Sequence, residues 1–167
     1  LSCYGSEFTS TPHIDGMASE GVVCDRAYTT NPVCTPARAS LFSGQYMSRH
    51  GAWNVGMNVP ESTTMLSHRL GQFGYPTHYI GKKHFQAYMG KDPRSNPSPA
   101  DSASTSIESR QGDWEKRFAE WHGPYYGFDR VELCLGHTIG GLGGHYGLWV
   151  TEQAGASSDL KGLGNAN

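Results

Sequence analysis

The most informative part of the chain reads Asn31-Pro-Val-Cys-Thr-Pro-Ala-Arg-Ala-Ser-Leu-Phe-Ser-Gly44. Thr35 suits a helix cap and Pro36 suits the first helical position, so Cys34 is expected just outside a helix N-terminus. Unpaired N–H groups and the helix dipole favour negative charge at such an end. Arg38, one turn further along, adds a fixed cation. The pattern predicts a polarised cysteine at an anion-binding helix end, which indicates nucleophilic attack on an oxyanion ester.

Helical and strand patterns alternate around this stretch. Three helical patterns, whose apolar stripes are expected to pack in the core, run from a cap at Thr11 to Gly21, from Thr63 to Gly74 and from Asp113 to Gly123. Short strand patterns follow them at residues 22–28, 77–80 and 131–135. Helices that alternate with short strands predict an α/β layered structure with a mostly parallel sheet.

The composition is that of a chain with a thin core. Its 167 residues carry a formal net charge of -2, which argues against a nucleic-acid-binding arm and a polybasic membrane patch. No apolar run is long enough for a transmembrane helix. Only 27 residues are Leu, Ile, Val or Phe, whereas 22 are Gly, so the chain is expected to be part of a larger fold. The four cysteines form no C-x-x-C pair, which disfavours a zinc ribbon or a thioredoxin-like site.

Two motifs resemble those of a known enzyme family. The spacing C-x-P-x-R from Cys34 to Arg38, followed by Leu41-Phe42 and Gly44, resembles the signature of the type I, formylglycine-dependent sulfatases. Cysteine phosphatases differ, because their arginine follows the nucleophile by six residues. The stretch Gly74-Tyr-Pro-Thr-His-Tyr-Ile-Gly-Lys-Lys-His84 is similar to the second sulfatase motif, G-Y-x-T-x-x-x-G-K-W-H. The resemblance covers roughly residues 1–150 and implies the N-terminal part of an alkaline phosphatase-like layered fold.

The resemblance also implies a domain division. Residues 1–150 are expected to belong to the sulfatase catalytic domain, with residues 91–111, which are rich in Ser and Pro, as a surface excursion. Residues 151–167 are expected to be a truncated polar tail.

The second motif makes chemical sense from its residues alone. A strand that ends at Gly81 would deliver Lys82 and His84 to its carboxyl end, where open α/β sheets bind ligands. On an extended chain these two side chains would point the same way. One cation and one proton donor would then converge on the same anion.

The resemblance implies a role for each of these residues. Cys34 would be oxidised by a formylglycine-generating enzyme to formylglycine, whose gem-diol attacks the sulfur of a sulfate monoester carried by a sugar or aryl group. Arg38 would hold the diol, Lys82 would bridge the formylglycine and the sulfate, and His84 would hydrogen-bond the sulfate or the leaving group. Lys83 departs from the family pattern, which has tryptophan there.

The resemblance implies a metal that the chain only partly supports. The family uses Ca²⁺, with Mg²⁺ possible, and Cys34 as formylglycine would be one ligand. The remaining ligands are expected to be absent from this chain, so the fragment alone is expected to be inactive. Asn54, His137 and His145 are lesser candidates for lining a substrate pocket.

Two other functions stay open on the sequence. One is a phosphonate or phosphodiester hydrolase of the same superfamily, and the other is a non-catalytic truncated remnant. The compartment cannot be read from the chain, although a periplasmic or exported bacterial protein is favoured.

Overall fold

The computed structural model describes residues 1–87, 106–108, 118–136 and 143–153. The helices and strands in these ranges are η1 (Ser2–Tyr4), α1 (Pro12–Glu20), α2 (Cys34–Ser43), α3 (Met47–His50), α4 (Leu66–Gln72), β1 (His78–Gly81), β2 (Arg130–Leu135) and α6 (Gly144–Gln153). None of the described helices is both long and apolar enough to cross a bilayer.

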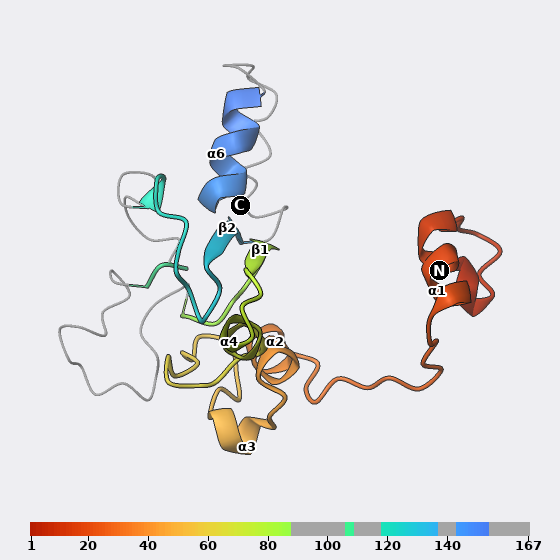
Figure 1. Cartoon of the computed structure of the whole chain (residues 1–167), viewed down its shortest axis with the longest axis horizontal. Coiled ribbons are helices and arrows are strands. Elements are labelled where there is room, and N and C mark those ends of the chain that lie inside the picture. Colours follow the sequence, from red (N-terminus) through yellow and green to blue (C-terminus); the bar gives the residue numbers. More distant parts are fainter. Residues whose placement is uncertain (88–105, 109–117, 137–142, 154–167) are drawn as a thin grey trace.

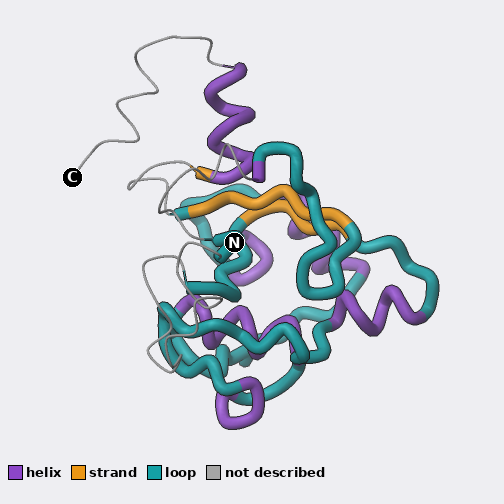
Figure 2. Tube along the Cα trace, turned by 90° about the vertical axis from the view of Figure 1, so that its left-hand side faces the viewer, coloured by secondary structure: helices purple, strands orange, loops and turns teal. Residues whose placement is uncertain are grey.

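The sheet is built from two segments that lie far apart in the sequence. β1 and β2 are parallel, with His78 opposite Arg130 and Gly81 opposite Leu133, and they run side by side in Figure 2. The α/β class and the parallel pairing predicted from the sequence are therefore confirmed. β2 shows the expected period of two, because Val131, Leu133 and Leu135 are buried while the residues between them are less so.

Among the described helices, α6 contacts the sheet most extensively. α6 packs on β2, and α2 contacts both α3 and α4 (Figure 1). Aromatic rings connect α2 to β1 and to the turn before β2: Phe42 makes edge-to-face contacts with Tyr79 and Phe128 at centroid distances of 5.6 and 5.9 Å. The site described below lies where α2 meets the end of β1.

The N-terminal segment is a separate small unit. α1 begins at Pro12 and ends before Gly21 as predicted, and it packs chiefly on η1, apart from the sheet (Figure 1). Polar contacts hold the unit, with Ser2 Oγ donating to Asp15 at 2.6 Å. None of the side chains of α1 is buried. The strand predicted at residues 22–28 is wrong, because that segment has no strand partner and is exposed.

The helix predicted after Thr63 begins later and faces the other way. α4 starts at Leu66, because Thr63 lies in a turn in which its N–H donates to the carbonyl of Pro60 at 2.9 Å. The predicted core stripe of Leu66, Leu70 and Phe73 is wrong, since these side chains are 55%, 36% and 80% exposed. Met65 and Ser67 are buried in their place.

Other predicted segments fall partly outside the described residues. Asp113 and Trp114, the predicted start of the third helix, lie outside the described residues. Further along the same predicted helix, Phe118 and Trp121 pack on each other with their ring centroids 6.2 Å apart. Of the predicted surface excursion only residues 106–108 are described, and Glu108 is buried. α6 continues to Gln153, past the boundary predicted at residue 150.

Candidate active site

Cys34 is the first residue of α2, so the helix begins two positions earlier than the sequence predicts. Val33 takes the cap position, and Thr35 does not cap the helix because its side chain is fully buried inside the first turn. Asn31 shapes the approach, since its Oδ1 accepts the N–H of Val33 at 2.7 Å, an Asx turn. The thiol therefore lies at a helix N-terminus, where the dipole favours an anion.

Lys82 contacts Cys34 from across the fold, and Arg38 binds the backbone of Lys82. The Nζ of Lys82 lies 3.8 Å from the Sγ of Cys34. The Nη1 of Arg38 donates to the backbone carbonyl of Lys82 at 2.7 Å, and the hydroxyl of Tyr79 donates to the same carbonyl at 2.6 Å. The end of β1 is thus tied to α2, and Cys34, Arg38 and Lys82 form one cluster.

A cavity opens in front of Cys34. Its volume is about 630 Å³, and its lining residues come from the approach loop and from α2: Ala27, Tyr28, Thr29, Thr30, Asn31, Pro32, Val33, Cys34, Ala37, Arg38, Ser40 and Leu41. This described lining holds one cation, Arg38, and no carboxylate. An anionic group would therefore be favoured there over a cation.

His84 is buried, and the chain before it is not the extended run that the sequence argument assumed. β1 ends at Gly81, whose φ is 120°, and His84 itself has a φ of 60°. The rule that alternate residues of a strand point the same way therefore does not apply from Lys82 to His84. His84 is 4% exposed.

Lys83, which lies between Lys82 and His84 in the sequence, has its side chain in the core. Its side chain is 1% exposed, and its Nζ lies 3.5 Å from the ring centroid of Phe128, 3.7 Å from that of Phe42 and 3.9 Å from that of Tyr79. Desolvation lowers the pKa of Lys83 to about 7, although the carboxylate of Glu108 acts to raise it.

Glu108 supports the same turn from beneath. Its Oε1 accepts the N–H of Phe85 at 2.7 Å and the hydroxyl of Tyr125 at 2.6 Å. Burial raises the pKa of Glu108, and these hydrogen bonds oppose that effect. The carboxyl group thus fixes the backbone that follows His84.

The lesser candidates do not join the cluster around Cys34. Asn54 is exposed, and its Oδ1 accepts the N–H of Val55. His145 is buried, its Nδ1 accepting the N–H of Leu133 at 2.9 Å and its Nε2 lying 2.7 Å from the carbonyl of Trp121. His137 lies outside the described residues.

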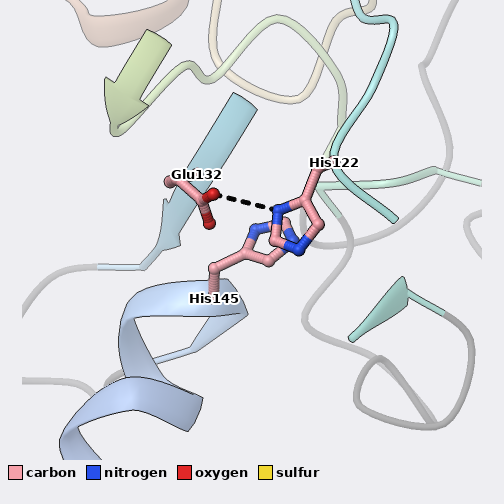
Figure 3. Close-up of side chains that lie close together, drawn as sticks. All are labelled: His122, Glu132 and His145. Carbon is pink, nitrogen blue, oxygen red and sulfur yellow. Dashed lines mark ion pairs between the residues drawn. The ribbon is translucent and has the colours of Figure 1, made fainter. Parts of the chain in front are cut away.

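A second cluster of His and Glu side chains lies beside α6 (Figure 3). The Nδ1 of His122 is 3.1 Å from Glu132, and its ring stacks on that of His145 with the centroids 4.5 Å apart. Among the described residues it is the group whose three donor atoms come close enough for a metal. Both nitrogens of His145 already bind backbone groups, so a metal there would break its hydrogen bond to Leu133 of β2 or that to Trp121. We interpret the cluster as a structural contact that holds α6 against β2.

The described residues do not form the calcium site that the resemblance implies. Ca²⁺ takes six to eight oxygen ligands, mostly from carboxylates and carbonyls. The described lining of the cavity at Cys34 contains no Asp or Glu, and the described group of three donors lies elsewhere. Any carboxylate ligands of such a metal would therefore come from outside this described lining.

Sequence reasoning missed three supporting residues. Lys83 left a signal, because it stands where the motif has tryptophan, but the sequence did not show that its side chain is buried. Tyr79 could be read only as a strand residue. Glu108 left no signal, since it falls in a segment rich in Ser and Pro that reads as surface.

Comparison with known proteins identifies the family of this chain. A family model described as Sulfatase matches residues 1–131. The chain is 38% identical over 88 residues to YidJ, an uncharacterized sulfatase of Escherichia coli K12, which is 53% of this chain and 18% of that protein. It is 33% identical over 138 residues to an ulvan-active sulfatase of Formosa agariphila, which is 80% of this chain and 25% of that protein.

A solved structure supports the fold. The crystal structure of Ps i-CgsB aligns with a TM-score of 0.52 and 24% identity, over 81% of this chain and 25% of that one. The chain therefore spans a quarter or less of the length of these relatives.

Proposed function

This chain belongs to the sulfatase family, and from that premise we propose that it carries the nucleophile of an enzyme that hydrolyses sulfate monoesters. The observation that carries the proposal is the 3.8 Å approach of the Lys82 Nζ to the Cys34 Sγ at the start of α2. A second cation, Arg38, lies in the same cluster. Two cations and a helix N-terminus around one nucleophile suit attack on an anionic ester.

Cys34, Arg38 and Lys82, together with the buried His84 outside their cluster, each take a role in this proposal. Cys34 is converted to formylglycine by a formylglycine-generating enzyme, and that group supplies a hydrated aldehyde as an oxygen nucleophile. Lys82 binds the sulfate beside residue 34, and Arg38 adds positive charge on the same side. His84 hydrogen-bonds the sulfate or the leaving group. Ca²⁺, or Mg²⁺, is proposed for the complete protein, with its other ligands outside the described part of this chain.

The proposed substrate is a sulfated carbohydrate, with an aryl sulfate as the alternative. A relative that aligns with 80% of this chain is named for its activity on ulvan, which supports the carbohydrate. The approach loop at residues 27–33 lines the cavity, and we propose that it contacts the leaving group.

Mass spectrometry tests the proposed maturation. The chain is produced with and without a formylglycine-generating enzyme, and trypsin releases residues 27–38 as one peptide, because Arg26 and Arg38 flank it. We expect Cys34 to lose its sulfur and gain an aldehyde oxygen only when that enzyme is present. Cys34→Ala is the control. An intact thiol in the co-expressed chain would contradict the proposal.

Thiol alkylation tests the anion site in the unconverted chain. Inorganic sulfate is expected to slow the reaction of iodoacetamide with Cys34, because a bound sulfate would cover the sulfur beside Lys82. Lys82→Met should weaken that protection. Cys24, which is exposed, gives the internal control in the same sample. Equal effects of sulfate on Cys34 and Cys24 would argue against a sulfate site.

A further inference from the structure

Lys83 separates two residues of the candidate site, yet its side chain is turned into the core. Its ammonium lies inside an aromatic box formed by Phe42, Tyr79, Phe85 and Phe128, with Nζ-to-centroid distances of 3.7, 3.9, 4.8 and 3.5 Å. Removing an ammonium from water is costly, and a cation over aromatic faces recovers part of that cost. The box therefore holds this side chain at a defined position.

The box is continuous with the face of α2 that carries the nucleophile. Cys34, Arg38 and Phe42 follow one another at intervals of four and so lie on one face of the helix. Each touches the pair Lys82-Lys83: the thiol lies 3.8 Å from the Nζ of Lys82, the guanidinium 2.7 Å from its carbonyl, and the ring 3.7 Å from the Nζ of Lys83. One face of α2 therefore contacts the pair Lys82-Lys83 at three positions.

The turn that carries the two lysines needs such support. Gly81 and His84 both have positive φ, and a non-glycine residue in that region persists only where its surroundings hold it. Behind the turn, Glu108 accepts the N–H of Phe85. In front of it, the carbonyl of Lys82 accepts hydrogen bonds from Arg38 and Tyr79. Lys83 lies between these two hydrogen-bonded positions, the carbonyl of Lys82 and the N–H of Phe85.

We propose that Lys83 is a positioning residue: its ammonium, held in the aromatic box, fixes the turn so that the Nζ of Lys82 stays at the sulfur of Cys34. This inference rests on the proposed function, because it assigns Lys82 to the nucleophile's site. Lys83 itself faces the box and not the cavity, so it acts through Lys82. An uncharged side chain of the same length would fill the box but lose the attraction that fixes the turn.

The alkylation rate of Cys34 at neutral pH tests this in the unconverted chain. The ammonium of Lys82 lies 3.8 Å from the sulfur, so the alkylation rate of Cys34 reports the position of Lys82. Lys83→Met is expected to slow alkylation roughly fivefold, toward the rate of Lys82→Met, because the charge–sulfur contact is lost. Peptide mapping separates Cys34 from Cys24, whose exposed thiol should react at an unchanged rate. Arg69→Met, which removes an exposed cation on α4, is the matched control.

The outcomes distinguish the two proposals. If Lys82→Met slows alkylation of Cys34 and Lys83→Met does not, the positioning role is wrong and the proposed site stands. If Lys82→Met has no effect either, the contact between Lys82 and Cys34 is wrong, and both proposals fail. Thermal unfolding shows whether each variant is folded. If Lys83 had only a structural role, its substitution would change the thermal stability and leave the alkylation rate of Cys34 unchanged.

A second variant covers the case in which Lys83→Met does not fold. Phe42→Leu removes one wall of the aromatic box and keeps an apolar side chain. It should slow alkylation of Cys34 in the same direction, by a smaller factor. In the double variant Lys83→Met, Phe42→Leu, the effects should not add, because both changes remove the same contact. Full additivity, or an unchanged rate in Phe42→Leu, would overturn the positioning role.

Discussion

At the scale of single residues, Lys83 brings together two opposing electrostatic effects. Desolvation lowers its pKa to about 7, because the charged form loses its water. The ring faces oppose this, since a desolvated cation–π contact contributes about 2 kcal/mol. The carboxylate of Glu108 acts in the same direction as the rings. Lys83, the residue that departs from the family motif, is therefore stabilised in its charged form by the aromatic rings and by Glu108.

His50 carries a prediction about acid stability. Its ring is 2% exposed and joins α3 to α2, with Nδ1 accepting the N–H of Ala52 and Nε2 lying 3.1 Å from Ser40. Burial lowers the pKa of His50 below its ordinary 6.5. The unfolded chain therefore binds more protons than the folded chain in acid, and the free energy of unfolding should fall as the pH drops below 6.5.

Denaturant unfolding of wild type and His50→Gln across acidic pH checks this. The variant should be less stable near neutral pH by about 1 kcal/mol or more, since a buried hydrogen-bonding group is replaced. The difference should shrink as the pH falls, because only the wild type loses this contribution. A difference that is constant with pH would contradict the assignment.

At the scale of elements, the tight turn before β2 packs against α4. Gly127 has a φ of 76°, and a Cβ there would lie 2.6 Å from the ring of His68. His68 holds the start of α4, because its Nδ1 accepts the N–H of Met65 at 3.0 Å. Ser67 adds a hydrogen bond to the carbonyl of Tyr126. The turn and the helix therefore depend on each other.

Gly127→Ala is expected to lower the free energy of unfolding by about 2 kcal/mol or more, through the positive φ and the contact with His68. Gly71→Ala is the matched control, since Gly71 lies in α4 with open space around its Cβ position. Helix propensity predicts that this change is neutral or stabilises by up to about 1 kcal/mol. Denaturant unfolding of both variants gives the comparison. Similar effects of the two changes would refute the packing argument.

At the scale of the whole molecule, the N-terminal unit is joined to the body by an exposed segment. Phe8, Val22 and Tyr28 are 98%, 91% and 87% exposed, and in Figure 1 the unit lies apart from the sheet. Such surfaces are normally covered in larger folds. The chain as a whole thus combines one packed body with apolar surface that its described residues leave open.

Limited trypsin digestion should report this arrangement. Within the described part of the chain, cleavage after Arg26 is expected first, because Arg26 lies in an exposed segment without helix or strand. Arg49 and Arg69 are also exposed but lie in α3 and α4. Mass spectrometry over time should therefore find a product that begins at Ala27. Earlier cleavage at Arg49 or Arg69 would mean that the segment is protected.

The 167-residue chain is expected to lack sulfatase activity even after conversion of Cys34. Its described residues supply no carboxylates at the cavity, and the chain spans only a part of its relatives. Hydrolysis of an aryl sulfate by the converted chain, measured beside Cys34→Ala, should be the same for both. Turnover above that control would show that further carboxylate ligands at the cavity are not needed.

Local patterns determined much of this protein from the sequence alone. The alternation of Val131, Leu133 and Leu135 predicted β2, and Pro12 predicted the start of α1. The spacing from Cys34 to Arg38 predicted the family, which the family match confirms. These features depend on neighbours within one element, where the period of the backbone fixes which side chains share a face.

Only the tertiary structure decided which distant residues meet. Cys34 and Lys82 are 48 residues apart, and their contact depends on how α2 packs on the end of β1. The aromatic box around Lys83 needs Phe42 and Phe128 from distant segments, and the buried Glu108 comes from a stretch whose composition reads as surface. No local period encodes these positions, because they arise from packing between segments and from the positive φ angles that interrupt the strand pattern.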